Sequence, residues 1–194
     1  MKSLLLFIPL LILFSFAPTN PTGYILLFEN SNNAKIYKFG NSGFMEYYLD
    51  KKKNILGKEY YVQVRAYSWG TSDTTYYRKD NEYFYQYKSE FNVESISIPV
   101  EPKLGFKWFE GDDSWHHEII DIDAVYKTPA RKYKHCIVMK SKQLTGRDKN
   151  KNKEYYMYYS KEFGFLGHAD AAGNPQSYLL KIKTKVREGD HIGW

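Results

Sequence analysis

Residues 74–88 read TTYYRKDNEYFYQYK, and this stretch decides the fold class. Two tyrosine-rich runs, residues 74–78 and 82–88, lie on either side of the polar letters KDN. Two extended runs joined by a short polar turn are typical of a β-hairpin. Aromatic residues favour the half-buried surface of a sheet, and they make up 18% of the whole chain. The stretch therefore predicts a β-rich protein.

Short extended runs and turn signals alternate on both sides of this hairpin. No segment shows the long 3.6-residue apolar period of a helix. Roughly ten strands at this spacing predict an all-β fold, a curved antiparallel sheet that forms a half-barrel or a barrel-like sandwich. We expect the turns to fall at residues 40–43, 51–54 with Gly57, 70–73, 111–113, 146–152 and 174–175.

Residues 1–17 have the three parts of a secretory signal peptide. Lys2 gives a positive start, residues 4–16 are nearly all apolar, and Ser15-Phe16-Ala17 is a small-x-small cleavage site. An uncleaved membrane anchor is the alternative, because Pro18 directly after the site disfavours cleavage. Cleavage there predicts an exported protein that is periplasmic, envelope-associated or secreted.

Composition divides the remainder of the chain into three parts. Residues 18–33 form a linker rich in Pro, Asn, Thr and Ser, residues 34–187 form a single β domain, and residues 188–194 form a C-terminal tail. The net charge of +6 is mild for 194 residues and suits at most a peripheral contact with anionic lipids. Because export separates the protein from the cytoplasm, we expect no nucleic-acid partner.

Two residues are expected in the core. Cys136 is the only cysteine, so the chain has no internal disulfide, and the apolar run that follows it predicts a buried, inert thiol. A thiol nucleophile activated by His135 is the alternative, but adjacent strand positions point to opposite faces. Trp108 shares a face with Phe106 and is expected to be a core anchor.

Two clusters of titratable residues are candidates for metal binding or acid–base chemistry. His116-His117-Glu118 resembles a metal site, but His116 and Glu118 share one strand face while His117 lies on the other with Ile119. Zinc needs three or four ligands, so we expect surface or rim histidines and no metal or other cofactor. Asp121 and Asp123 share a face and could act as acid and base, although the same alternation is typical of a half-solvated strand.

Tyrosine supplies the most unusual pattern. Tyrosine rings can line an apolar groove or stack on a sugar while the hydroxyl stays wet, and they can equally form cross-strand pairs that stabilise a sheet. If the chain binds a ligand, the candidate residues are the alternating tyrosines Tyr83, Tyr85, Tyr87, Tyr156 and Tyr158.

Two basic features have a simple structural interpretation. Lys181, Lys183 and Lys185 alternate with apolar residues, which predicts a solvated outer face that protects an edge strand. Residues 146–153 form a basic loop, for which a generic contact with lipid head groups is the only functional reading.

Four stretches of the chain have a recognisable order and spacing. They are YKFGN (37–41) with FMEY (44–47), IP (98–99) with LGFKW (104–108), KTPARKYKHC (127–136) and EFGFL (162–166). Together they resemble a family of exported bacterial proteins and lipoproteins of unassigned function, although Lys38 and Arg131 replace the family's usual Pro and Gly, and Phe44 lies near its usual Trp. The resemblance implies a curved antiparallel sheet, similar to the half-barrels that carry lipoproteins across a periplasm, and it implies no catalytic residue.

The sequence leaves three functions open. The first is a structural or interaction module of the bacterial envelope, with a protein partner and no catalytic activity. The alternative is a module that binds a lipid or another amphipathic ligand on a concave, aromatic sheet face. A hydrolase built on Asp121, Asp123 or His117 is the third, and no nucleophile elbow, zinc-protease motif or phosphate loop supports it. We therefore expect no enzyme.

Overall fold

The computed structural model describes residues 24, 33–146, 149–150 and 154–184. The expected signal peptide, most of the linker, the C-terminal tail and most of the basic loop lie outside these residues. In the described part of the chain, no helix is long and apolar enough to cross a membrane.

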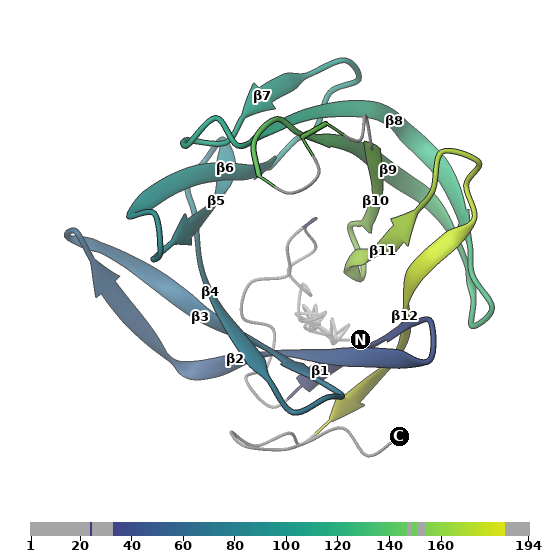
Figure 1. The fold of residues 1–194 in the computed structure, drawn as a ribbon, viewed down its shortest axis with the longest axis horizontal. Coiled ribbons are helices and arrows are strands. Elements are labelled where there is room, and N and C mark those ends of the chain that lie inside the picture. Colours follow the sequence, from purple (N-terminus) through teal and green to yellow (C-terminus); the bar gives the residue numbers. More distant parts are fainter. Residues whose placement is uncertain (1–23, 25–32, 147–148, 151–153, 185–194) are drawn as a thin grey trace, which may run out of the picture.

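One antiparallel sheet of twelve strands makes up the fold and curves until it is nearly closed into a barrel (Figure 1). The all-β prediction is confirmed, with two strands more than the expected ten. Neighbouring strands in the sequence pair with one another except β6 and β7, and β1 also pairs with β12. The order in the sheet is therefore β6-β5-β4-β3-β2-β1-β12-β11-β10-β9-β8-β7. The strands are β1 (Asn33–Phe39), β2 (Ser42–Ile55), β3 (Lys58–Tyr67), β4 (Ser72–Lys79), β5 (Tyr83–Lys88), β6 (Val93–Pro99), β7 (Lys107–Phe109), β8 (Trp115–Lys127), β9 (Lys132–Gln143), β10 (Glu154–Ser160), β11 (Gly164–Ala169) and β12 (Pro175–Thr184).

Side chains close the barrel where the two end strands, β6 and β7, meet. The indole N–H of Trp108 donates to the main-chain carbonyl of Ile96 at 3.0 Å, and the N–H of Gly111 donates to Ser95 Oγ at 2.8 Å. Trp108 is buried in an apolar cluster with Phe84 and Ile119, as the core prediction requires. The ring is thus completed by packing and single hydrogen bonds and has no full strand ladder at this seam.

The long β8–β9 hairpin reaches beyond its own ladder to other strands of the barrel. Tyr126 Oη donates to the carbonyl of Ser177 at 2.7 Å and lies 2.9 Å from that of His168. Figure 1 shows the tip of this hairpin beside β12, at the right of the ring. Cys136 belongs to the cluster beneath it and has no exposed surface, so its predicted burial is confirmed.

One expected turn is wrong. Residues 51–54 continue β2, and the chain reverses at Leu56 and Gly57, both of which have a positive φ. Lysines are uncommon in strands, but residues 51–54 of β2 are solvent-exposed. Lys52 Nζ lies 4.7 Å from the centre of the Tyr61 ring on β3, and Lys53 Nζ lies 4.8 Å from that of Tyr76 on β4. The run can therefore remain extended.

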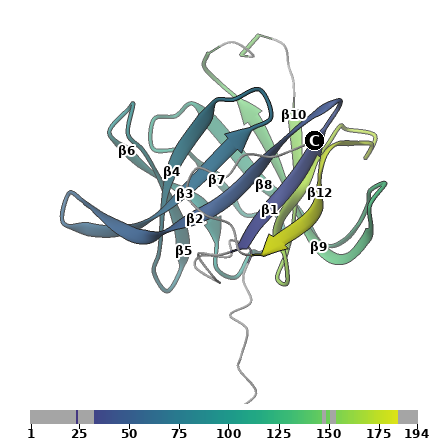
Figure 2. The ribbon, with the colours of Figure 1, turned by 90° about the horizontal axis from the view of Figure 1, so that it is seen from below.

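The lysines of β12 do not protect a sheet edge, because β12 lies between β1 and β11. Lys181 and Lys183 are solvent-exposed as predicted, and Lys185 lies outside the described residues. The edges belong to β6 and β7. Figure 2 shows β1, β2 and β12 side by side on the opposite wall of the barrel.

Candidate functional site: the barrel interior

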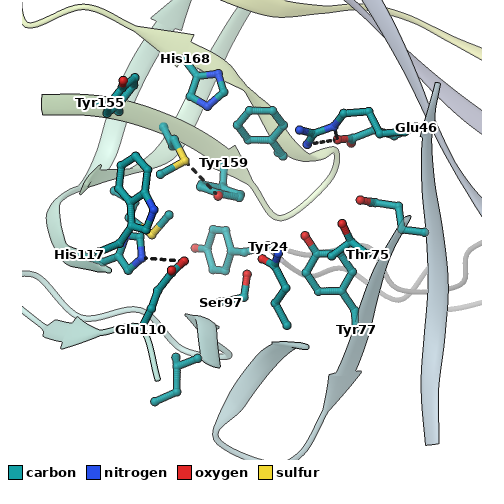
Figure 3. A pocket seen from close by; sticks show the side chains of 18 of the residues that line it. Tyr24, Glu46, Thr75, Tyr77, Ser97, Glu110, His117, Tyr155, Tyr159 and His168 are labelled. Atoms are coloured by element: carbon teal, nitrogen blue, oxygen red, sulfur yellow. Dashed lines mark hydrogen bonds and ion pairs between the residues drawn. The ribbon is translucent and has the colours of Figure 1, made fainter. Parts of the chain in front are cut away.

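The barrel interior contains a partly open cavity of about 650 Å³. In an eight-stranded barrel the interior holds side chains or one small ligand, so twelve strands leave space that side chains do not fill. The volume lies within the range of about 300–1,000 Å³ that is usual for small-molecule sites. Residues from ten of the twelve strands line the cavity, and Figure 3 shows ten of these side chains labelled.

One wall of the cavity, formed by β2 to β5, carries neutral hydrogen-bonding side chains in two cross-strand rows. The first row runs Tyr48–Gln63–Thr75, where each residue is the register partner of the next. The second row pairs Tyr77 with Gln86. Gln63 Nε2 donates to Tyr48 Oη at 3.1 Å. We call these five residues the polar wall.

The facing wall, from β8 to β11, is mainly aromatic and thioether in character. Two cross-strand pairs, Met139 with Met157 and Tyr159 with Phe165, form most of it. The rings of Tyr159 and Phe165 pack with their centres 5.4 Å apart. With Trp115 these residues make up what we call the apolar wall. In Figure 3, Thr75 and Tyr77 lie on one side of the cavity, and His117 and Tyr155 lie on the other.

A buried ion pair lies beside the polar wall. Arg65 Nη2 and Nε donate to Glu46 Oε1 at 2.5 and 2.9 Å. Burial alone would lower the pKa of the Arg65 guanidinium, but the charge and hydrogen bonds of Glu46 outweigh it and raise the pKa. Arg65 is 37% accessible, and because it lines the cavity this surface opens on the barrel interior. Both charges are therefore kept and compensated inside the protein.

A second polar group combines Ser141, His117 and Glu110. Ser141 Oγ lies 2.7 Å from His117 Nδ1, and His117 Nε2 lies 3.6 Å from Glu110 Oε1. Burial alone would raise the pKa of Glu110, but hydrogen bonds from His117, Lys88 and Ser114 lower it.

These are the residue types of a serine hydrolase, but their placement does not suit one. Ser141 has no exposed surface and does not line the cavity, so its hydroxyl cannot reach a substrate carbonyl there. The prediction that the histidines lie at the surface or rim is wrong for His117, which is buried. Its strand face, shared with Ile119, is the inner one.

His168 supplies the remaining imidazole of the cavity. Its Nδ1 lies 2.8 Å from Ser177 Oγ, which holds the ring against β12. Burial lowers the pKa of His168 to about 4, and the positive charge of Arg65 acts in the same direction. At neutral pH the ring is uncharged and adds no net charge to the cavity.

Tyr24 reaches the interior from outside the strands. Its side chain is buried in the same cluster as Trp108 and Tyr159, and it lines the cavity. Figure 3 shows its ring between the two walls. Burial raises the pKa of the Tyr24 hydroxyl. The sequence analysis assigned this residue to a linker, and no periodic pattern around it signalled an interior position.

The five predicted ligand-binding tyrosines do not line the cavity. Tyr83, Tyr85 and Tyr87 alternate with Phe84 and Gln86, and it is the latter two that belong to the core cluster or the cavity. Alternation correctly grouped the tyrosines on one face, but it does not state which face is concave.

On β10, too, the predicted ligand-binding residues lie on the strand face that points away from the cavity. Tyr156 and Tyr158 alternate with the cavity residues Tyr155, Met157 and Tyr159. Tyr158 instead stacks on Tyr126 of the long hairpin, with ring centres 4.2 Å apart. Tyr158 thus takes part in a sheet-stabilising aromatic pair, which is the structural interpretation of the pattern, and the Tyr156 hydroxyl donates to Glu154 Oε2 at 2.8 Å.

The other candidate residues lie outside the cavity. Asp121 and Asp123 are exposed, and Asp123 Oδ1 lies 2.7 Å from Nδ1 of the equally exposed His135. Cys136 is buried on a different face from His135, so the two form no catalytic pair. Within the described residues, no three His, Cys, Asp or Glu side chains are grouped so as to hold a metal ion.

The resemblance to a family of exported bacterial proteins and lipoproteins rests on the four sequence stretches alone and stays a prediction. Searches of protein-family models, curated proteins and solved structures find no match to this chain.

Proposed function

We propose that this chain is a non-catalytic binding module that holds an amphipathic ligand, such as a lipid, inside its barrel. The observation that carries the proposal is the cavity of about 650 Å³ between a polar and an apolar wall. A largely pre-formed cavity with a few placed polar groups is typical of small-molecule sites. The lining side chains project from paired strands, which hold them in fixed positions.

The cavity lining also supports binding over catalysis. The carboxylates of Glu46 and Glu110 are engaged by Arg65 and Lys88, so neither is free to act as a general base. Among the described residues, the two serines that contact the cavity histidines, Ser141 and Ser177, are both buried and do not line the cavity. The lining can therefore recognise a ligand without supplying a nucleophile.

Export to the cell envelope is part of the proposal. It rests on the signal-like residues 1–17 and on a chain with a single, buried cysteine, which needs no disulfide to fold. In such a compartment a barrel with an interior cavity could shield the apolar part of an amphipathic compound from water.

A structural or interaction module is the second candidate, and one surface feature favours it. Trp69 is 58% exposed and stacks on Tyr67 with ring centres 4.5 Å apart, at the turn between β3 and β4. Exposed tryptophans often anchor protein interfaces. The cavity outweighs this feature, because a protein-binding role alone does not require an unfilled interior.

The test is mass spectrometry of extracts from the purified native protein. Thr75 lines the cavity and the adjacent Thr74 is exposed, so Thr75→Trp and Thr74→Trp form a matched pair. We expect a discrete amphipathic compound, near one equivalent, from the wild type and from Thr74→Trp, and much less from Thr75→Trp. An intact-mass spectrum of the bare polypeptide, together with no binding of a neutral hydrophobic dye, would overturn the proposal.

A further inference from the structure

The two sides of the cavity differ in whether their polar side chains already have hydrogen-bond partners within the protein. Beside the apolar wall, the two imidazoles of the cavity are each held by a serine, His117 by Ser141 and His168 by Ser177. On the polar wall, no described residue gives a hydrogen-bond partner to the side chains of Thr75, Tyr77 or Gln86. Among the described strand residues, the open hydrogen-bonding capacity is thus concentrated on β4 and β5 and includes Ser97 on the adjacent β6.

This open capacity points to a ligand rather than to the needs of folding. Buried polar groups are normally hydrogen-bonded, and an unpartnered one is destabilising unless water or a ligand satisfies it. Tyr77 and Gln86 are direct register partners, and Thr75 lies one inward position along β4 from Tyr77. Three neutral donors and acceptors are therefore presented together on one wall.

Two of the charged groups of the lining are held in ion pairs within the protein, Arg65 with Glu46 and Glu110 with Lys88. The ammonium group of Lys35 donates to the carbonyl of Phe163 at 2.6 Å. An anionic head group could bind Arg65 only by displacing Glu46, which would leave a buried carboxylate without its partner. The lining therefore disfavours a ligand with a net charge.

The polar wall lies across the ring from β9, β10 and β11 (Figure 1), which contribute Met139, Met157 and Phe165 to the cavity lining. A plain acyl chain would satisfy the apolar wall and leave the polar wall unsatisfied. A sugar ring presents hydroxyls along its edges and C–H groups on its face, which suits a cavity with one wall of each kind.

We infer that the ligand of this cavity is uncharged and carries several hydroxyl groups on one side, as a neutral glycoside or glycolipid does, with those hydroxyls bound by Thr75, Tyr77 and Gln86. The inference rests on the proposed function, since it names the chemical class of the same ligand. It excludes fatty-acid anions and phospholipids as the preferred occupants.

The test compares two probes with the same eight-carbon chain, octyl glucoside below its micelle concentration and octanoate, by isothermal titration calorimetry at pH 7.5. We expect octyl glucoside to bind at least tenfold more tightly. Thr75→Val with Gln86→Leu should weaken glucoside binding about tenfold and change octanoate binding less than threefold. Thr74→Val, on the exposed side of the same strand, is the matched control and should change neither.

Failure of the inference and failure of the proposed function give different results. Octanoate binding that equals or exceeds glucoside binding, and that Thr75→Trp abolishes, would overturn the inference and leave the binding module intact. A co-purified anionic lipid would do the same. If neither probe binds and no compound co-purifies, both proposals fall. Thermal melting of each variant shows whether a loss of binding reflects unfolding.

Discussion

Trp108 and Ile96 join the two ends of the sheet. The indole N–H of Trp108, on β7, donates to the main-chain carbonyl of Ile96, on β6, at 3.0 Å. No strand ladder crosses this seam in the described residues, because the order of the sheet begins at β6 and ends at β7. One buried side chain thus contributes both apolar packing and a hydrogen bond where the barrel closes.

Trp108→Ala should destabilise the protein more than any surface change. Truncating a buried tryptophan typically reduces the free energy of unfolding by about 3–5 kcal/mol, out of a total of about 5–15 kcal/mol. The urea midpoint should therefore fall strongly. Trp108→Phe keeps much of the packing and loses the hydrogen bond to Ile96, so its midpoint should lie between those of wild type and Trp108→Ala. A midpoint that barely moves in Trp108→Ala would contradict the assigned role.

The thiol of Cys136 should react slowly in the folded protein. It has no exposed surface, and burial raises its pKa to about 11, so almost no reactive thiolate is present at pH 7.5. Labelling with a chromogenic disulfide reagent should be slow in buffer and fast in 6 M guanidinium. Rapid, stoichiometric labelling without denaturant would show that the β8–β9 hairpin does not cover the thiol.

Most of the fold could be predicted from local sequence, and its closure could not. The β4–β5 hairpin follows directly from residues 74–88, since alternating aromatic residues and a polar turn specify two paired strands. Closure depends on contacts between Trp108 and Ile96, which lie on strands that form no ladder. No local pattern shows that these two ends will meet.

The site was harder to predict because alternation leaves the inward face undefined. Tyr85 and Gln86 are equally consistent with the concave face until the curvature of the sheet is known. Irregularities also shift the alternation on the partner strands. Ser97 of β6 is an extra residue opposite Phe84 and Tyr85, and Leu166 of β11 is an extra residue opposite Tyr158 and Tyr159. For His117 the signal was present, since it shares a face with the apolar Ile119, and that face is the buried one.

Glu46→Gln should destabilise the barrel by leaving Arg65 without its counter-charge. Breaking a buried pair typically costs about 3–5 kcal/mol, and we expect about 2–3 kcal/mol here because Arg65 opens on the cavity and can recruit water. Chemical denaturation measures the loss. The double variant Glu46→Gln with Arg65→Met removes both charges and should recover part of the stability. If the double variant is less stable than Glu46→Gln, the pair is not the cause.

Acid should destabilise the protein through His168. Its pKa is about 4 in the folded state and about 6.5 when unfolded, so between these values the unfolded chain binds more protons. The contribution of His168 to stability is complete above pH 6.5 and falls as the pH drops toward 4, by at most about 1.4 kcal/mol per pH unit. His168→Gln can keep a hydrogen bond to Ser177 and should show a shallower loss of melting temperature between pH 6.5 and 4.5. An unchanged slope would assign the effect to other groups.

The mature chain should begin between Pro18 and Gly23. A cut after Ala17 follows from the small-x-small pattern of the leader. The structure also limits how late the mature chain can begin. Tyr24 packs in the interior cluster with Trp108, and a chain that starts after Tyr24 would lose that contact. N-terminal sequencing of the exported protein measures the start directly. Chains that begin at Gly23 and at Ile25 can also be compared, and we expect the shorter one to melt at a lower temperature. An intact Met1 in a membrane fraction would refute the cleavage, and equal melting temperatures would remove Tyr24 from the core.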